Sequence, residues 1–174
     1  MENELKQMLQ NGITKYRYDP NTYFNSPVVI VKKSAGGIRL VINFISLNER
    51  TVDDRYQMPN ANELLSRVAG GKFITKIDLT SAFFQVELET NSQKYTGLQT
   101  PFGTFSYLRM FQGLKAAPST CQRLMDFVLR GTHKYAGTLT DDTMVFSETF
   151  DKPLVHVRDI LQRLRMAGST ANSK

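Results

Sequence analysis

Three acidic side chains are the residues of this chain best suited to chemistry. Asp78 ends the largely apolar run from Phe73 to Ile77, and Asp141 and Asp142 lie side by side among apolar and small residues. A carboxylate beside apolar neighbours costs free energy unless it is paired, hydrated or bound to a cation, and two adjacent carboxylates repel each other. Their hard oxygen atoms suit Mg²⁺, which takes a few carboxylates together with substrate phosphates. Two such ions can assist phosphoryl transfer.

The same acids have a plainer interpretation. An Asp-Asp pair is favourable in a tight turn, and Asp78 would then only terminate a strand. Residue type and spacing alone leave a metal site and a simple turn equally supported. The choice depends on the elements that carry the acids.

The charge balance favours an anionic partner. The 174 residues include 22 Lys and Arg against 16 Asp and Glu, a net charge of +6. The excess is local, because residues 26–46 hold three bases and no acid, and residues 91–140 hold six bases against one acid. Such basic regions are typical of proteins that bind nucleic acid.

Several classes of protein are disfavoured. The single cysteine, Cys121, excludes an intramolecular disulfide framework and a cysteine-rich zinc site. Apolar stretches such as Val28 to Val31 are far shorter than the roughly 20 residues that span a bilayer. The charged first ten residues do not resemble a secretion signal. We therefore expect a soluble, unsecreted protein of the cytoplasm or nucleus, with no membrane partner.

The hydrophobic patterns predict a mixed α+β fold in which the acids lie at strand ends. Helices are expected over residues 2–10, 61–69, 118–130 and 153–167, and strands over 28–33, 38–44, 73–79 and twice within 135–146, with a hairpin in 95–110. Asp141-Asp142 falls at the turn of the last strand pair. The buried stripe expected for the third helix is Cys121, Leu124, Met125, Val128 and Leu129, and for the fourth Leu154, Val157, Leu161 and Leu164.

The order of short sequence blocks along the chain is more specific. The blocks are Leu5–Ile13, Ser26–Val29, Leu47-Asn48, Asp54–Pro59, Lys76–Leu79, Thr100–Gly103, Gly113–Pro118, Gln122–Met125, Asp141-Asp142 and Leu161–Arg165. With these blocks the chain resembles the reverse transcriptase of retroviruses and of gypsy-like long-terminal-repeat retrotransposons, a part of their Pol polyproteins.

That resemblance implies the fingers and palm of a right-hand RNA-directed DNA polymerase. The expected palm is an antiparallel sheet backed by helices. The expected division is fingers at 1–72, palm at 73–90, an interruption at 91–112 and palm again at 113–174. Neither a thumb nor an RNase H region is expected within these residues.

The resemblance also implies roles for the acids. Asp78, Asp141 and Asp142 correspond to the aspartates that hold two Mg²⁺ ions, with Mn²⁺ as an alternative, during nucleotidyl transfer from a deoxynucleoside triphosphate to a primer 3′-hydroxyl. Phe83 corresponds to the aromatic residue that excludes a ribose 2′-hydroxyl. In its plainer interpretation, Phe83 is a core residue.

Further residues are implied in binding of nucleotide and template-primer. Arg39, with Lys32 or Lys33, corresponds to the phosphate-binding positions of the fingers, for which guanidinium and ammonium groups are suited. Gln112 and Gly113 correspond to a pair that contacts nucleotide and template. Without the resemblance, the three bases would be read as solvated charges on an edge strand.

One departure keeps a second function open. The family usually has Tyr two residues before the adjacent aspartates, where this chain has Leu139. The alternative is therefore a decayed retroelement remnant that folds and binds nucleic acid without polymerising. A metal-dependent phosphohydrolase is a third class, supported by the acids alone. The sequence does not indicate an oligomeric state.

Overall fold

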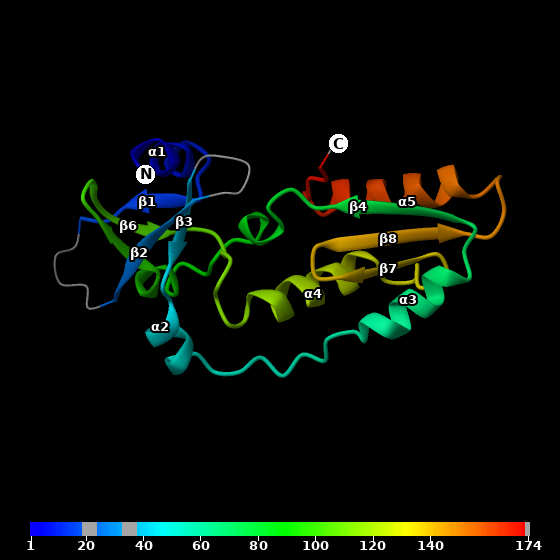
Figure 1. The fold of residues 1–174 in the computed structure, drawn as a ribbon, viewed down its shortest axis with the longest axis horizontal. Helices are drawn as coiled ribbons and strands as arrows, with labels where there is room; N and C mark the ends of the chain where they lie inside the picture. Colours follow the sequence, from blue (N-terminus) through cyan, green and yellow to red (C-terminus); the bar gives the residue numbers. More distant parts are fainter. Residues whose placement is uncertain (19–23, 33–37, 173–174) are drawn as a thin grey trace. The chain divides into compact units, whose positions relative to one another are not determined.

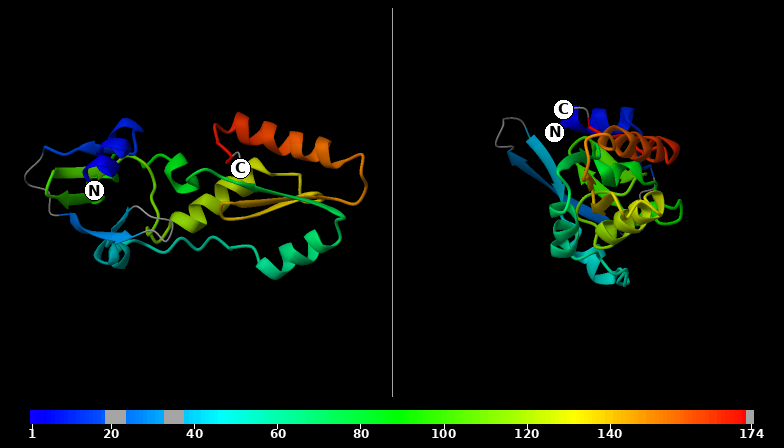
Figure 2. Two further views of the ribbon diagram at one scale, coloured as in Figure 1. Left: turned by 45° about the horizontal axis from the view of Figure 1, so that its top comes forward. Right: turned by 90° about the vertical axis from the view of Figure 1, so that its right-hand side faces the viewer.

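The chain forms two compact units whose segments alternate along the sequence. A computed structural model describes residues 1–18, 24–32 and 38–172. Unit 1 consists of Met1–Asp53 and Val86–Ala117, and unit 2 of Asp54–Gln85 and Pro118–Lys174. Figures 1 and 2 draw both units. The fold class is α+β, as expected from the sequence. None of the helices within the described ranges is long and apolar enough to span a bilayer.

Unit 1 contains a five-stranded sheet of order β1-β6-β5-β2-β3. Its elements are α1 (Glu2–Gln10), β1 (Thr14–Tyr16), β2 (Asn25–Lys32), β3 (Ile38–Ile42), α2 (Ile45–Arg50), a 3₁₀ turn (Gln93–Tyr95), β5 (Gly97–Thr100) and β6 (Gly103–Tyr107). Strands β2 and β3 are antiparallel, whereas β2 and β5 are parallel. The buried rings of Phe44 and Phe111 stack at 4.2 Å between centroids, and Tyr107 packs on Phe111 at 4.4 Å. This aromatic cluster lies in the core of unit 1.

Both predicted hairpins of unit 1 are present. Strands β2 and β3 form the first, and its expected tip at residues 34–37 lies outside the described residues. Strands β5 and β6 form the second, with Gly103 in the left-handed region at φ 119°. The patterns missed α2 and β1, which are too short to show a periodicity of their own.

Unit 2 is built on a three-stranded antiparallel sheet of order β4-β8-β7. Its elements are α3 (Ala61–Ala69), β4 (Phe73–Asp78), a 3₁₀ turn (Ala82–Gln85), α4 (Ala117–Val128), β7 (Ala136–Leu139), β8 (Asp142–Ser147) and α5 (Pro153–Met166). Helix α5 packs against β8 and β4, and α3 packs against β7 and β8 (Figures 1 and 2). This is the expected antiparallel sheet backed by helices.

The two faces of this sheet differ in burial. Because side chains alternate along a strand, the register places one set of residues on a covered face. That set is buried and consists of Ile77, Ala136, Thr138, Thr143 and Val145. The other face carries Lys76, Asp78 and Asp142, which are exposed or partly exposed. The acids therefore lie at an uncovered end of this face, whose other part packs against α3 through Met144 and Phe146.

Two predicted helix faces need correction. In α5, Leu154 is 79% and Leu161 43% exposed, whereas Ile160 and Leu164 are buried. The helix carries two apolar stripes, and the one through Ile160 meets the sheet. In α4, Leu124 is 37% exposed, and the polar Gln122 is fully buried beside the expected apolar residues.

A carboxylate fixes α5 to the residue before β7. The Tyr135 hydroxyl donates to Asp159 Oδ2 at 2.6 Å, and Arg163 Nε donates to the same oxygen at 2.9 Å. The hydrogen bond from Tyr135, followed by the bond and charge of Arg163, lowers the pKa of Asp159 against the opposing effect of desolvation. Charged Asp159 therefore stabilises unit 2.

We predict that Tyr135→Phe lowers the free energy of unfolding by about 1 kcal/mol at pH 7. A lowered native pKa contributes stability that is present above the ordinary aspartate pKa of 3.8 and is lost as the pH falls through the native pKa, so the deficit should shrink below pH 3.8. Urea unfolding followed by circular dichroism measures both values. Tyr18→Phe is the control, because Tyr18 is 88% exposed. An equal deficit at the two pH values would contradict a role for ionised Asp159.

Candidate functional site

The structure brings the three predicted aspartates to one end of the unit 2 sheet. Asp78, the last residue of β4, is the direct cross-strand partner of Asp142, the first residue of β8. Such partners point to the same face with Cβ atoms about 5 Å apart. Asp141 lies in the turn between β7 and β8, and its carbonyl accepts a hydrogen bond from the Leu79 amide at 3.3 Å. The acids are thus gathered by the register of one strand pair.

A lysine that the sequence analysis did not single out neutralises part of this charge. Lys76 Nζ lies 2.9 Å from Asp142 Oδ2. The hydrogen bond to Asp142 raises the pKa of Lys76, and the charges of Asp142, Asp78 and Asp141 add to this, while desolvation opposes it. The sequence held one sign of this contact: Lys76 and Asp78 are two residues apart, so both side chains lie on the same face of a strand. The end of the sheet attracts a cation.

Asp78 has a second neighbour near the end of the described chain. Asn172 Nδ2 donates to Asp78 Oδ2 at 3.3 Å, and the Asn172 amide donates to the Asp78 carbonyl at 2.8 Å. Ala171 forms a bridge with Leu79 beside them. These contacts hold the end of β4 while the Asp78 side chain remains exposed.

The donor set fits a divalent cation that is completed by other ligands. Among residues 1–18, 24–32 and 38–172, no three His, Cys, Asp or Glu side chains form a ready-made metal cage. Mg²⁺ and Mn²⁺ prefer oxygen ligands, and Mg²⁺ commonly keeps waters and substrate phosphates beside one or two carboxylates. Carboxylates on an exposed sheet end, one of them already holding an ammonium group, match that requirement.

The turn before the adjacent aspartates has an uncommon backbone. Thr140 adopts φ 59°, in the left-handed region that β-branched residues avoid. Leu139, at the position for which the resemblance implies Tyr, packs against a cluster of Leu64, Val68 and Phe146. Leu139 therefore fastens the end of β7 to α3 by apolar contact.

Cys121 lies next to this turn, and its thiol is unreactive. Its Sγ is 3.5 Å from the Thr140 carbonyl. Burial, with a smaller effect from the charge of Asp141, raises the pKa of Cys121 to about 11. A thiol with that pKa is almost entirely protonated near neutrality and is a poor nucleophile.

Phe83 lies in the 3₁₀ turn that follows Asp78 in unit 2, and it is partly buried. Gln85 holds this turn, since its Nε2 donates to the carbonyls of Thr80 at 2.6 Å and Thr170 at 2.9 Å. Its Oε1 accepts from the Thr170 amide at 3.0 Å. The position of Phe83 is thus fixed to the chain next to Asp78.

The predicted nucleotide-binding bases lie in unit 1. Lys32 is exposed at the end of β2, opposite Ile38. Arg39 is in β3, opposite Val31, and its side chain lies outside what the structure describes. Lys33 also lies outside the described residues. Their roles stay predictions.

Gln112 and Gly113 also belong to unit 1, in an exposed loop held by an asparagine. Gly113 has φ 101°, and its carbonyl accepts from Asn48 Nδ2 at 2.8 Å. Asn48 Oδ1 accepts from the Lys115 amide at 2.9 Å, and Lys115 also forms an ion pair with Asp53. The sequence indicated Asn48 only as part of the Leu47-Asn48 block and gave it no role. Its side chain fixes the shape of the loop.

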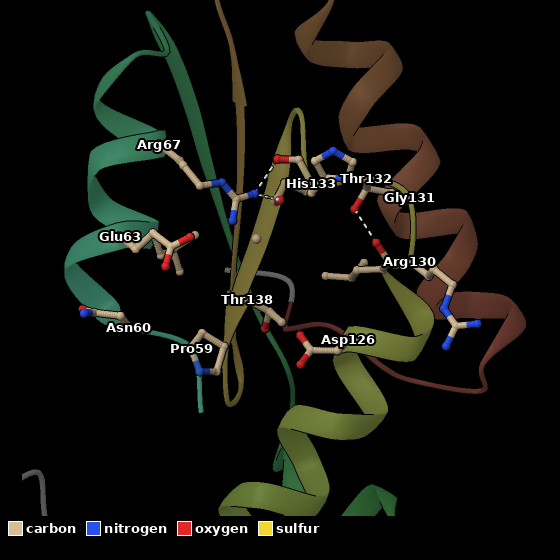
Figure 3. A pocket seen from close by; sticks show the side chains of 14 residues that line it. Pro59, Asn60, Glu63, Arg67, Asp126, Arg130, Gly131, Thr132, His133 and Thr138 are labelled. Carbon is tan, nitrogen blue, oxygen red and sulfur yellow. Dashed lines mark hydrogen bonds between the residues drawn. The ribbon is translucent and has the colours of Figure 1, made fainter. Parts of the chain in front are cut away.

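A cavity of about 250 Å³ in unit 2 is lined by residues of α3, α4 and β7 but by none of the three aspartates (Figure 3). Arg67 crosses it and donates to the carbonyls of His133 and Ala136, the latter at 2.9 Å. Glu63 and Asp126 are also on its wall. The Arg67 guanidinium therefore holds the segment before β7 to α3.

Comparisons with known proteins indicate the family of the chain. A family model described as reverse transcriptase (RNA-dependent DNA polymerase) matches residues 30–174. The chain is 34% identical over 170 residues to the retrovirus-related Pol polyprotein from transposon 297 of Drosophila melanogaster, covering 94% of this chain and 16% of that protein. It is 33% identical to the enzymatic polyprotein of cauliflower mosaic virus, strain NY8153, covering 99% of this chain and 26% of that protein. The chain thus spans about a quarter or less of these relatives.

Solved structures share the fold. The native crystal structure of prototype foamy virus protease-reverse transcriptase superimposes with a TM-score of 0.88 at 19% identity, covering 98% of this chain and 22% of that chain. A foamy viral protease-reverse transcriptase in complex with an RNA/DNA hybrid gives a TM-score of 0.88 at 20% identity, with the same coverages of 98% and 22%.

We predict that Lys76→Met makes the chain more responsive to Mg²⁺. Without divalent cations the variant should be slightly less stable than the unaltered chain, because Asp142 loses its partner at a solvent-exposed site where ion pairs contribute little. The increase in melting temperature on adding Mg²⁺ should then exceed that of the unaltered chain. Lys72→Met is the control, since Lys72 is an exposed lysine just before β4. Equal Mg²⁺-induced shifts in all three proteins would show that cations do not bind beside Asp142.

Proposed function

Because the chain belongs to the reverse transcriptase family, we propose that its clustered aspartates catalyse RNA-templated transfer of a deoxynucleotide to a primer 3′-hydroxyl. The observation that supports this most strongly is the direct pairing of Asp78 with Asp142 across β4 and β8, with Asp141 in the adjoining turn. A pair of like charges at an exposed strand end costs stability, which cation binding offsets.

Each residue of the cluster has a distinct part. Asp78, Asp141 and Asp142 would hold two divalent cations, Mg²⁺ or Mn²⁺, which supply Lewis acidity at the phosphoryl oxygens and at the primer hydroxyl. Asp78 and Asp142 share an exposed end of the sheet, where a substrate can approach. Lys76 neutralises Asp142 when no metal is bound and so limits repulsion within the cluster. Phosphoryl transfer of this kind depends on positioning and electrostatics rather than on covalent catalysis.

Two groups of residues, distant from each other in the sequence, would hold the incoming nucleotide. Lys32, Lys33 and Arg39 would bind the triphosphate, for which ammonium and guanidinium groups are suited. Gln112 and Gly113 would contact the nucleotide and template from the loop that Asn48 shapes. Phe83 would exclude ribonucleotides by filling the space of a 2′-hydroxyl.

The macromolecular partner we propose is a template-primer duplex. Foamy viral protease-reverse transcriptase has been solved with double-stranded DNA and with an RNA/DNA hybrid. The net charge of +6 on this chain supports binding to a polyanion. Such binding weakens as salt concentration increases, because bound phosphates release counterions.

One observation favours a second candidate function. Leu139 is used in apolar packing against the α3 cluster and offers no hydroxyl group next to Asp141. A chain with this substitution could bind template-primer without extending it. This is the remnant hypothesis. Only a measurement of primer extension distinguishes it from the first proposed function.

We predict that Asp141→Asn reduces primer extension on an RNA template at least about a hundredfold, since it removes a charged ligand from the proposed metal site. Template-primer affinity measured by fluorescence anisotropy should stay within about threefold, because the triphosphate and metal are not needed for duplex binding. Asp151→Asn is the matched control, as Asp151 is exposed in the loop before α5.

The outcomes separate the two functions. Extension that survives Asp141→Asn would contradict the assignment of the acids. Salt-sensitive binding of the unaltered chain without any extension, in Mg²⁺ or Mn²⁺, would favour the remnant hypothesis. The extension assay should therefore be run with each metal, and the binding assay at two salt concentrations.

A further inference from the structure

A hydrogen-bonded chain of side chains connects the segment before α3 to the turn that carries Asp141. The Tyr56 hydroxyl donates to Asp126 Oδ2 at 2.5 Å. Gln122 Nε2 donates to Asp126 Oδ1 at 2.9 Å, and Gln122 Oε1 accepts from the Thr140 amide at 2.7 Å. We call these four residues the Gln122 network. All of them lie in unit 2.

Gln122 is the central member and its orientation is fixed. Its side chain is fully buried, with 0% exposure, and Nε2 also donates to the Thr138 carbonyl at 3.2 Å. The carboxylate of Asp126 and the carbonyl of Thr138 can only accept, so the amide nitrogen must face them. The amide oxygen must then face the Thr140 N–H. A buried amide is costly unless it is bonded, and here both ends are satisfied.

Thr140, whose amide donates to Gln122, has a strained backbone conformation. Thr140 adopts φ 59°, in the left-handed region, which a β-branched residue keeps only when the surrounding structure holds it there. Thr140 immediately precedes Asp141 and Asp142. The turn therefore needs support from outside the strand pair to keep its shape. The 2.7 Å hydrogen bond that the Thr140 amide donates to Gln122 Oε1 supplies it.

The far end of the network is also fastened. Asp54 and Arg123 form an ion pair at 2.9 Å. The Arg123 guanidinium lies over the ring of Tyr56, 5.5 Å from its centroid. These contacts hold the Asp54–Pro59 segment, one of the sequence blocks to which the proposed reaction gives no part, against α4.

We propose that Gln122 is a positioning residue that fixes Asp141 and Asp142 for cation binding, with Asp126 and Tyr56 setting its orientation. This inference rests on the proposed function, because it takes the aspartates as cation ligands. Groups that orient metal ligands commonly change metal affinity by about 10–100-fold when they are removed. Gln122 would act through the Thr140 amide, without touching substrate or metal.

The test uses Gln122→Met in the full chain, because Met matches Gln in length but has no amide. We expect the Mn²⁺ dissociation constant, measured by electron paramagnetic resonance titration, to rise about 10–100-fold. Hydrogen exchange of the Thr140 amide, followed by NMR, should accelerate as its acceptor is lost. Met125→Leu is the matched control on the same helix, since Met125 is buried and contributes no hydrogen bond to the network.

Tyr56→Phe is the second variant, and it keeps the test decisive should Gln122→Met fail to fold. It removes only the bond to Asp126, so we expect a weakening of Mn²⁺ binding that is smaller than that of Gln122→Met but outside the error of the control. Unchanged Mn²⁺ affinity and Thr140 exchange in every one of these variants that folds would overturn the positioning role.

Asp141→Asn distinguishes this failure from failure of the proposed function. If the unaltered chain binds Mn²⁺ and Asp141→Asn does not, the metal site stands and the Gln122 variants alone decide the inference. If the unaltered chain and Asp141→Asn bind Mn²⁺ equally, the aspartates are not the ligands, and the positioning role is overturned with the site.

Discussion

The repulsion between two carboxylates paired across β4 and β8 is the constraint on which the rest of unit 2 depends. Asp78 and Asp142 are direct partners in the strand register, an arrangement that destabilises a sheet when both are charged. The surrounding residues reduce that cost. Lys76 contacts Asp142, and Asn172 donates to Asp78. A sheet end that tolerates such a pair is suited to cations, and this links the fold to the proposed reaction.

The helices of unit 2 hold this sheet end in place in different ways. Helix α3 supplies Leu64 and Val68, against which Phe146 and Leu139 pack. Helix α4 supplies a buried amide that bonds the backbone of the turn. Apolar packing therefore determines where β7 ends, and hydrogen bonding determines how the chain then turns toward Asp141. Leu139 therefore supplies apolar packing at the position for which the resemblance implies tyrosine, but it has no hydroxyl group.

The sequence predicted those features that depend on local pattern. Both strand pairs of unit 1, the longer helices and the aspartates at strand ends were found where the patterns placed them. It did not predict the buried face of α5, because two apolar stripes compete on that helix and only the sheet selects Ile160. It also missed Lys76, Asn48 and Gln122 as contributors, since their contacts join residues that are 16 to 67 positions apart or on neighbouring strands. Such contacts have no signature in a single sequence, whereas the resemblance to reverse transcriptases implied a shared role for the three aspartates, which stays a prediction.

The most direct test of the central claim is anomalous X-ray scattering from crystals of this chain soaked in Mn²⁺. The account predicts an anomalous peak within bonding distance of carboxylate oxygens of Asp78 and Asp142, with Lys76 displaced from Asp142. A peak bound by other residues, with Asp78 and Asp142 still carrying only Lys76 and Asn172, would contradict it.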